Sequence, residues 1–349
     1  MKVLVIADPH IPVPPTHYGG AERIVHLYAE EFTQLGHTVH LMAGPSSRSY
    51  GNGRLHIHHA PTLNYWSRAR RKIQFQAQSL WTAQDCDVIY NHGRFDYLEA
   101  LLRFRKPILN KFPNPIDQQQ INFAERRIRS NVVFHCISEN QRAAAHIQTP
   151  TVVIPNPIDT RLYQAGDGSG GYLAFLGRLT RNKGVDIAIA VACKTQKKLI
   201  IAGNISKEEG GEAFFQQEVE PHLDGEHIRW IGPVNDRQKQ ELLSQAEALL
   251  FPIRWEEPFG MVMVEALACG TPVIATRRAS TPEVIEHGRT GFLCAPAEPS
   301  VDAFVTAIAQ LPSLNRADCR IAAETRFDVR QVTPRVLNVL TQLVTGAFA

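Results

Sequence analysis

Residues 172–202 read YLAFLGRLTRNKGVDIAIAVACKTQKKLIIA and decide the fold class. A short apolar run at 172–177 is followed by a loop, a helical stretch at 185–196 and a second apolar run at 198–202. Short apolar strands that alternate with helices are typical of parallel sheets connected by crossover helices. This stretch therefore predicts one strand–helix–strand unit of an α/β domain.

The same alternation runs through the rest of the chain. We expect further strands at 2–7, 38–43, 55–59, 87–90, 107–110, 132–136, 151–154, 227–231, 248–252 and 272–275. We expect further helices at 21–36, 66–83, 95–104, 118–129, 139–148, 212–222, 236–245 and 260–269. The Pro- and Gly-rich segment 154–171 separates two such series and reads as an interdomain connection. The sequence thus predicts two doubly wound domains, 1–158 and 159–325, and a final helical segment, 326–349, that crosses back to the first.

Composition indicates a globular protein with ordinary cores. The chain has 349 residues, of which 44% are apolar, enough for two domains. The start, MKVLVIADP, is too short in its apolar part for a signal or a membrane span, so we expect a cytoplasmic protein. Six scattered cysteines without a C-x-x-C pair predict buried free thiols. Residues 1–158 hold 17 Lys/Arg against 11 Asp/Glu, and the remainder holds 20 against 23.

A Pro-rich loop after the first strand ends on Gly19 and Gly20, directly before a helix. Glycines at a helix start let a ligand approach the backbone, and the free amides and helix dipole favour an anion such as phosphate. A flexible turn without a ligand fits the motif equally well. A dinucleotide fingerprint is absent, because G-x-G-x-x-G does not follow the strand.

Two cations follow the strand at 172–177. Arg178 comes directly after it and Lys183 lies five residues further on, before a helix. An arginine fork and a lysine point charge at a strand's carboxyl end can bind adjoining phosphates. The alternative is an ordinary pair of surface cations.

The stretch 255–271, WEEPFGMVMVEALACGT, places Glu265 alone in an apolar helix, eight residues after Glu257. Gly260 marks the turn into that helix, so residues 259–262 would offer unpaired amides. Helical side chains lean toward the N-terminus, which directs Glu265 toward the same loop. Carboxylates accept hydrogen bonds from vicinal hydroxyls, so sugar, ribose and diphosphate fit this stretch. The alternative is a buried ion pair between Glu265 and an Arg or Lys.

These motifs, taken in order, resemble a known family. EEPFGMVMVE, ACGTPVIA, PEVIEHGRTGFL, GRLTRNKG, IPNPID and YGGAE make the chain similar to retaining nucleotide-sugar glycosyltransferases of the GT-B fold, most closely family 4. The resemblance implies two Rossmann-like domains facing each other across a cleft, the first on the acceptor side and the second binding the donor. It also implies transfer of a sugar from a UDP- or GDP-sugar to an acceptor hydroxyl with retention of configuration.

The same resemblance implies roles for single residues. Arg178 and Lys183 would bind the donor diphosphate, and Glu265 the ribose hydroxyls. Glu257, with amides of Phe259, Gly260, Met261 and Val262, would hold the donor sugar and distal phosphate. Gly19 and Gly20 would face the diphosphate, and His92 would lie near the transferred sugar. Two departures are Asn91, where relatives often carry His, and Pro157, where Gly is usual; Glu256 has no assigned role.

No cofactor or metal is expected beside the donor. Asp85-Cys86-Asp87 has the D-x-D form of metal-dependent transferases, but it precedes a strand, so Asp87 is expected to end a turn there. His56, His58 and His59 lie on one short strand without a carboxylate or Cys nearby, which makes metal binding the less favoured interpretation. No nucleic-acid partner is expected.

The stretch 66–81, WSRARRKIQFQAQSLW, mixes four basic residues with aromatic ones. Such helices can rest on anionic membranes, and the alternative is a solvated helix with an ordinary core face. The acceptor stays open between lipid, sugar and small molecule. Alternatives to a transferase are a nucleotide-sugar 2-epimerase of the same fold and a non-catalytic nucleotide-sugar-binding module.

Overall fold

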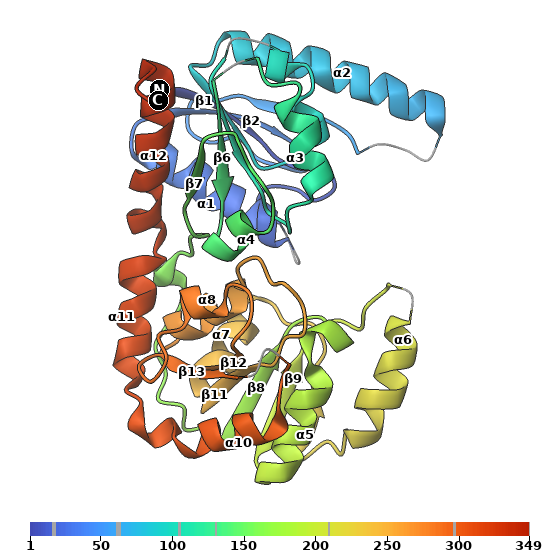
Figure 1. Ribbon diagram of the computed structural model, residues 1–349, viewed down its shortest axis with the longest axis vertical. Helices are drawn as coiled ribbons and strands as arrows, with labels where there is room; N and C mark the ends of the chain where they lie inside the picture. The colour runs from blue at the N-terminus through green and yellow to red at the C-terminus, as the bar shows by residue number, and fades with distance from the viewer. Residues whose placement is uncertain are drawn as a thin grey trace. The chain divides into compact units, whose positions relative to one another are not determined.

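The computed structural model describes residues 1–15, 19–60, 64–103, 106–129, 131–208, 210–295 and 298–348, with the side chains of Tyr65, Arg68 and Asp96 excepted. The chain divides into two compact units (Figure 1). Unit 1 comprises Met1–Pro157 and Val329–Ala349, and unit 2 comprises Ile158–Asp328. These limits lie close to the boundaries of 158 and 325 expected from the sequence.

Unit 1 is built on a seven-stranded parallel sheet in the order β3-β2-β1-β4-β5-β6-β7. Its strands are β1 (Lys2–Ile6), β2 (Thr38–Ala43), β3 (Leu55–Ile57), β4 (Val88–Asn91), β5 (Ile108–Lys111), β6 (Val132–Cys136) and β7 (Thr151–Val153). Its helices are α1 (Gly20–Gln34), α2 (Tyr65–Gln84), η1 (Phe95–Leu98), η2 (Leu101–Arg103), α3 (Gln118–Glu125), α4 (Glu139–Ala143) and α12 (Val329–Thr345).

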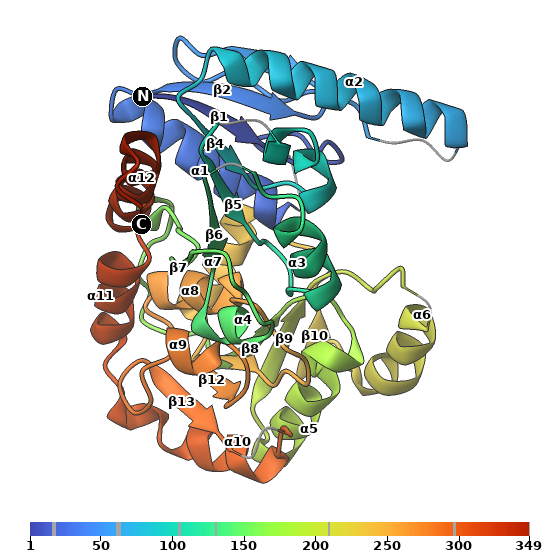
Figure 2. The same ribbon diagram turned by 45° about the horizontal axis from the view of Figure 1, so that its top comes forward.

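The two faces of this sheet pack against different helices. Leu4, Ile89 and Phe134 face the core formed with α2, η1, η2 and α3. The side chains that alternate with them face α1 and α12: Tyr90, for example, packs edge-on against Tyr28 of α1. Helix α12, the last of the chain, lies along α1, β4 and β5 (Figure 2). The segment 329–345 therefore completes a layer that begins at residue 20.

Unit 2 holds a six-stranded parallel sheet in the order β10-β9-β8-β11-β12-β13. Its strands are β8 (Tyr172–Leu176), β9 (Lys198–Ala202), β10 (Ile228–Trp230), β11 (Ala248–Phe251), β12 (Val273–Thr276) and β13 (Gly291–Cys294). The last of these was not predicted from the sequence.

The helices of unit 2 are η3 (Thr160–Leu162), η4 (Arg181–Lys183), α5 (Val185–Thr195), α6 (Gly211–Phe214), η5 (Phe215–Val219), η6 (Glu220–His222), α7 (Asp236–Gln245), α8 (Met261–Ala268), α9 (Thr281–Val284), α10 (Val301–Ala309), η7 (Leu311–Ser313) and α11 (Arg316–Arg326). One sheet face packs on α5, η5 and α10. The other carries α7 and α8. Where one helix was predicted at 212–222, the chain passes from α to π to 3-10 geometry. Pro221 cannot donate the amide that an α-helix requires.

The cysteines follow the prediction except at one position. Cys86, Cys136, Cys269, Cys294 and Cys319 are buried free thiols. Cys193 is exposed, because it lies on the solvent side of α5. Within the described ranges, no helix is both long and apolar enough to cross a membrane.

Candidate active site

The strand order of unit 2 places a switch point between β8 and β11. Successive strands continue from β8 toward one edge of the sheet and from β11 toward the other. In open parallel sheets, ligands bind beyond the carboxyl ends of the strands at such a point. The segments that leave the sheet here are residues 177–184 and 252–260. They carry Arg178, Lys183 and Glu257 and lead into the helix that carries Glu265.

Lys183, at the end of η4, forms an ion pair with the carboxylate of Glu257. The indole N–H of Trp255 donates to the same carboxylate oxygen over 3.2 Å. The Lys183 ammonium lies 4.5 Å from the centroid of that indole ring. The side chains of Lys183 and Glu257 are only 16% and 12% exposed. Such a partly desolvated pair is stable only while both charges are present.

The two segments are fastened to each other by backbone and side-chain contacts. Gly184 has φ +78°, and a Cβ there would lie 2.0 Å from the carbonyl oxygen of Pro252. The Arg254 amide donates to the carbonyl of Asn182 over 2.8 Å. The Arg254 guanidinium makes two hydrogen bonds of 2.8 Å to Asp186. The close approach of the two segments therefore requires a glycine at position 184, the last residue of the GRLTRNKG motif.

Arg178 has a looser environment than Lys183. Its guanidinium pairs with Glu208 at 2.5 Å, and the two side chains are 37% and 68% exposed. Exposed pairs of this kind contribute little to stability. Arg178 can therefore exchange Glu208 for another anion at small cost.

The start of α8 offers backbone amides beside Glu257. Gly260 caps the helix with φ +80°. Among the described residues, no acceptor reaches the amides of Met261 and Val262. Phe259 is buried against Phe327, with 5.9 Å between the ring centroids. Free first-turn amides and the positive end of the helix dipole favour an anion here.

Glu265, in the second turn of α8, is 5% exposed and has two partners that sequence reasoning missed. The ammonium of Lys239 on α7 lies 2.5 Å from its carboxylate. The hydroxyl of Tyr163 donates to the same oxygen over 3.1 Å. In the ligand-free protein, Glu265 thus forms a buried ion pair with a lysine, which is the alternative interpretation of the sequence. Lys239 and Tyr163 lie far from Glu265 in the sequence, and no motif marks them.

Glu256 and the D-x-D motif have structural partners. The Glu256 carboxylate pairs with Arg278 at 3.0 Å. Asp85 pairs with the Lys2 ammonium at 2.9 Å, and Asp87 accepts the Lys2 amide over 2.8 Å. As predicted, Asp87 directly precedes β4, at the amino end of the strands and opposite the ligand edge.

In unit 1, the switch point lies between β1 and β4, and the predicted residues again follow these two strands. Gly19 precedes α1, and a Cβ at this position would lie 2.7 Å from the Cβ of Pro15. Gly20 has open space around it. Tyr18 of the YGGAE motif lies outside the described residues. Packing therefore explains Gly19 but not Gly20.

His92 directly follows β4 and is 3% exposed. Its ring packs against Tyr28 and Tyr90, with centroid distances of 5.7 and 4.1 Å. Burial, and then the nearby charge of Lys111, hold the pKa of His92 well below its ordinary value. The ring is therefore neutral at pH 7, and no described residue bonds to its Nε2.

Asn91 explains one departure from the family pattern. Its amide nitrogen donates to Asn110 Oδ1 on β5 over 2.7 Å and to the carbonyl of Gly93 over 3.1 Å. Its amide oxygen accepts the Gly93 N–H. Asn91 thus fixes the turn on which His92 stands.

His56 of β3 and His58, directly after it, take part in packing. His56 lies 6.2 Å from Trp81, and His58 lies 4.7 Å from Phe75, between ring centroids. His58 Nε2 is 3.1 Å from the carbonyl oxygen of Ala7. In the part of the chain that the structure describes, no three His, Cys, Asp or Glu side chains are grouped as a metal site.

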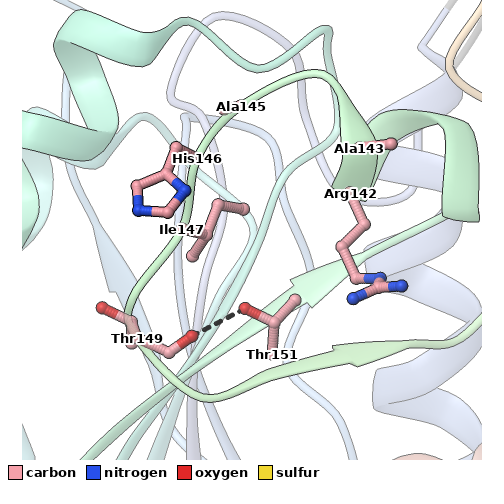
Figure 3. A pocket seen from close by; sticks show the side chains of 7 residues that line it. All are labelled: Arg142, Ala143, Ala145, His146, Ile147, Thr149 and Thr151. Atoms are coloured by element: carbon pink, nitrogen blue, oxygen red, sulfur yellow. Dashed lines mark hydrogen bonds between the residues drawn. The ribbon is translucent and has the colours of Figure 1, made fainter.

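A separate hollow of about 430 Å³ lies beside α4 and β7 (Figure 3). Arg142 and His146 line opposite sides of it, and the Thr151 hydroxyl donates to the carbonyl of Thr149 over 2.9 Å. None of the predicted site residues lines this hollow.

Two family models match the chain, one in each half. "Glycosyltransferase Family 4" matches residues 18–162, and "Glycosyl transferases group 1" matches residues 166–326. Among curated proteins, glycogen synthase of Mycobacterium tuberculosis is 31% identical over 129 residues, which are 36% of this chain and 30% of that protein. The match thus spans less than a third of that relative. Alpha-maltose-1-phosphate synthase of Mycolicibacterium smegmatis is 25% identical over 321 residues, covering 80% and 81% of the two chains.

A solved structure extends the likeness over the whole chain. HepE of Anabaena, in complex with UDP and glucose, superposes with a TM-score of 0.75 at 20% identity, covering 98% of this chain and 100% of that chain. The two parallel α/β sheets, together with the similarity of the whole chain to this solved structure, define the GT-B fold class. The two family-model matches together take in most of the chain, which belongs to the group 1, family 4 glycosyltransferases.

Proposed function

We propose that the protein transfers a hexose from a UDP- or GDP-sugar to an acceptor hydroxyl with retention of anomeric configuration. The observation that carries this proposal is the switch point of unit 2. There Arg178, Lys183 and the first amides of α8 offer positive charge at the ligand edge of one sheet, with Glu257 beside them.

The ion pairs of the free protein fit this role. Lys183 and Lys239 each neutralise one carboxylate while no ligand is bound. A diphosphate would draw Arg178 and Lys183 to its oxygens, which frees Glu257 to accept sugar hydroxyls. Glu265 would accept the ribose hydroxyls, with Lys239 keeping its charge balanced. The pairs thus keep buried charges compensated until the donor arrives.

The reaction needs charge stabilisation more than a nucleophile. The bond from the anomeric carbon to the diphosphate oxygen breaks, the acceptor oxygen bonds to that carbon from the same face, and its proton passes to the departing phosphate. Arg178, Lys183 and the α8 amides bind the diphosphate more tightly as its negative charge grows, which lowers the barrier. Because the chain itself supplies these cations, we propose that no metal is required. His92 would contact the transferred sugar.

The comparisons support the donor class. HepE binds UDP-glucose in one solved complex and UDP with glucose in another. Alpha-maltose-1-phosphate synthase and glycogen synthase are named for products built from glucose.

A thermal-shift panel of UDP, GDP and ADP with their sugars tests the donor site. A ligand at 100 times its dissociation constant adds about 2.7 kcal/mol of stability. We expect one nucleotide to raise the melting temperature, and Arg178→Ala and Glu265→Gln each to abolish that rise. Arg237→Ala, which removes an 85% exposed cation, should leave it intact. A rise that persists in both site variants would contradict the assignment.

A second measurement separates a transferase from its alternatives. The protein should slowly release free nucleotide and a sugar of unchanged configuration from its donor when water replaces the acceptor. Release together with a 2-epimerised sugar would indicate an epimerase. Binding without any release would indicate a sensor.

We also propose that helix α2 contacts an anionic membrane. Trp66, Ile73 and Trp81 are 79%, 69% and 62% exposed. They project within about 80° of one another on a helix of 3.6 residues per turn. Arg70 is exposed on the same side of the helix, whereas Lys72 lies on another side and pairs with Glu99 at 2.7 Å. The helix itself has no acidic residue. In both views α2 extends beyond the edge of its sheet (Figures 1 and 2).

Vesicle sedimentation tests this surface. Vesicles with phosphatidylglycerol should bind the protein, and Trp66→Ala with Ile73→Ala, which removes two side chains that are 79% and 69% exposed, should release it without changing the melting temperature. Equal binding of the double variant would rule out α2 as the contact. This result does not affect the donor proposal.

A further inference from the structure

Lys111 is a buried cation without a counter-ion. It is the last residue of β5 and is 2% exposed. Among the described residues, none forms a hydrogen bond or an ion pair with its ammonium group. A buried charge without a partner is costly, so a lysine kept in such a place is a candidate for ligand binding.

The surroundings of Lys111 are polar but contain other weak bases. Lys111 is directly paired in register with His135 on β6, and His92 stands beside it at the end of β4. Burial lowers the pKa of Lys111 to about 7. The lysine in turn contributes to lowering the pKa of both histidines.

The other described groups around this face supply no negative charge to Lys111 or His135. The Tyr90 hydroxyl is 3.0 Å from His135 Nδ1, and Tyr28 covers the face from α1. From α12, Arg335 donates to the carbonyl of Val153 over 3.2 Å and acts as a further positive charge on His135. Within the described residues, burial is the cause that sets the Lys111 pKa, and no carboxylate contributes.

We infer that Lys111, beside His92, binds an anionic group of the acceptor, a phosphate or a carboxylate. The pair lies at the carboxyl ends of β4 and β5, the edge where parallel sheets bind ligands. An anion there would supply the missing counter-charge of the Lys111 ammonium. It would also place the acceptor near Nε2 of His92, to which no described residue bonds. This inference rests on the proposed transferase function, and it concerns an anion other than the donor diphosphate, whose proposed side-chain ligands, Arg178 and Lys183, lie in unit 2.

Calorimetry of the full chain at pH 8.5 tests the inference with sulfate and acetate as probes. Neither probe titrates near this pH, so any proton taken up goes to the protein. Because a lysine with a pKa of about 7 is mostly neutral at pH 8.5, an anion that binds it must bring in close to one proton. Titrations in two buffers of different ionisation enthalpy count that proton. Stronger binding of sulfate points to a phosphate acceptor, and stronger binding of acetate to a carboxylate.

Two variants make the result specific. Lys111→Met should weaken the preferred anion roughly 10- to 100-fold, the effect of losing one charge-assisted hydrogen bond, and abolish proton uptake. Lys111→Arg should still bind the anion, but without taking up a proton, because arginine stays charged.

Anion binding without proton uptake in the native protein, or uptake that persists in Lys111→Met, would overturn the inference. So would the absence of binding, which would leave Lys111 among internal waters. The nucleotide panel is independent of these titrations, so failure here and failure of the donor site are distinguishable.

Discussion

Replacing Lys111 with methionine should stabilise the free protein. The pKa of this lysine falls from 10.5 to about 7 on folding, which corresponds to about 5 kcal/mol at 1.36 kcal/mol per unit. Between these two values the unfolded chain binds the proton and the folded chain does not, so stability rises with pH there. Below pH 7 both states are protonated and the full cost of burial applies. Lys111→Met removes that cost and should gain up to about 5 kcal/mol at pH 6–7.

The pH dependence of this gain is the sharper observable. Equilibrium unfolding of both proteins in guanidinium chloride at pH 7, 8 and 9 gives their difference in free energy of unfolding. Other titrating groups contribute equally to both and cancel. The advantage of the variant should shrink by up to about 1.4 kcal/mol per pH unit. Lys111→Arg is the control, since its charge does not titrate and its difference from Lys111→Met should stay constant. If the difference in free energy of unfolding between the native protein and Lys111→Met also stayed constant from pH 7 to 9, Lys111 could not be a buried, unpaired amine.

Three other predictions follow from the site of unit 2. Lys239→Met leaves the buried Glu265 carboxylate with only the Tyr163 hydroxyl as its partner among the described residues. The variant should lose about 3 kcal/mol of stability in denaturant unfolding and bind nucleotide more weakly. Unchanged stability and unchanged binding would be inconsistent with the Lys239–Glu265 ion pair. Gly184→Ala places a Cβ 2.0 Å from the Pro252 carbonyl oxygen at a positive φ, so the melting temperature should fall and donor binding weaken; a normal melting temperature would speak against the close approach. Addition of EDTA should leave donor-dependent activity unchanged, whereas a loss restored by Mg²⁺ would show that the cations of the chain do not suffice.

The sheets could be predicted from the sequence because strand and helix periods are local signals. The apolar runs at 38–43 and 132–136, for example, coincide with β2 and β6. β13 was missed because GFLC is a short run that follows a Gly-containing turn rather than a clear helix. The helix at 212–222 was predicted as uniform because periodicity does not reveal a change of hydrogen-bond register.

The site was predictable only where its residues share a motif. Glu257 and Glu265 stand in one stretch, so their common helix start could be derived. Their partners could not, because Lys239 and Tyr163 reach Glu265 from separate elements. Lys111 gave no signal, since a lysine at a strand end looks like an ordinary surface residue until the fold covers it.

The division of the chain has a consequence for biosynthesis. Unit 1 needs residues 329–345, because α12 packs on α1, β4 and β5. A ribosome adds roughly 5–20 residues per second, and domains fold as units once their sequence has emerged. Unit 2 is continuous and can therefore finish folding while unit 1 still exposes the apolar surface that α12 will cover. Chaperones that act during translation would be expected to recognise that surface on the nascent chain.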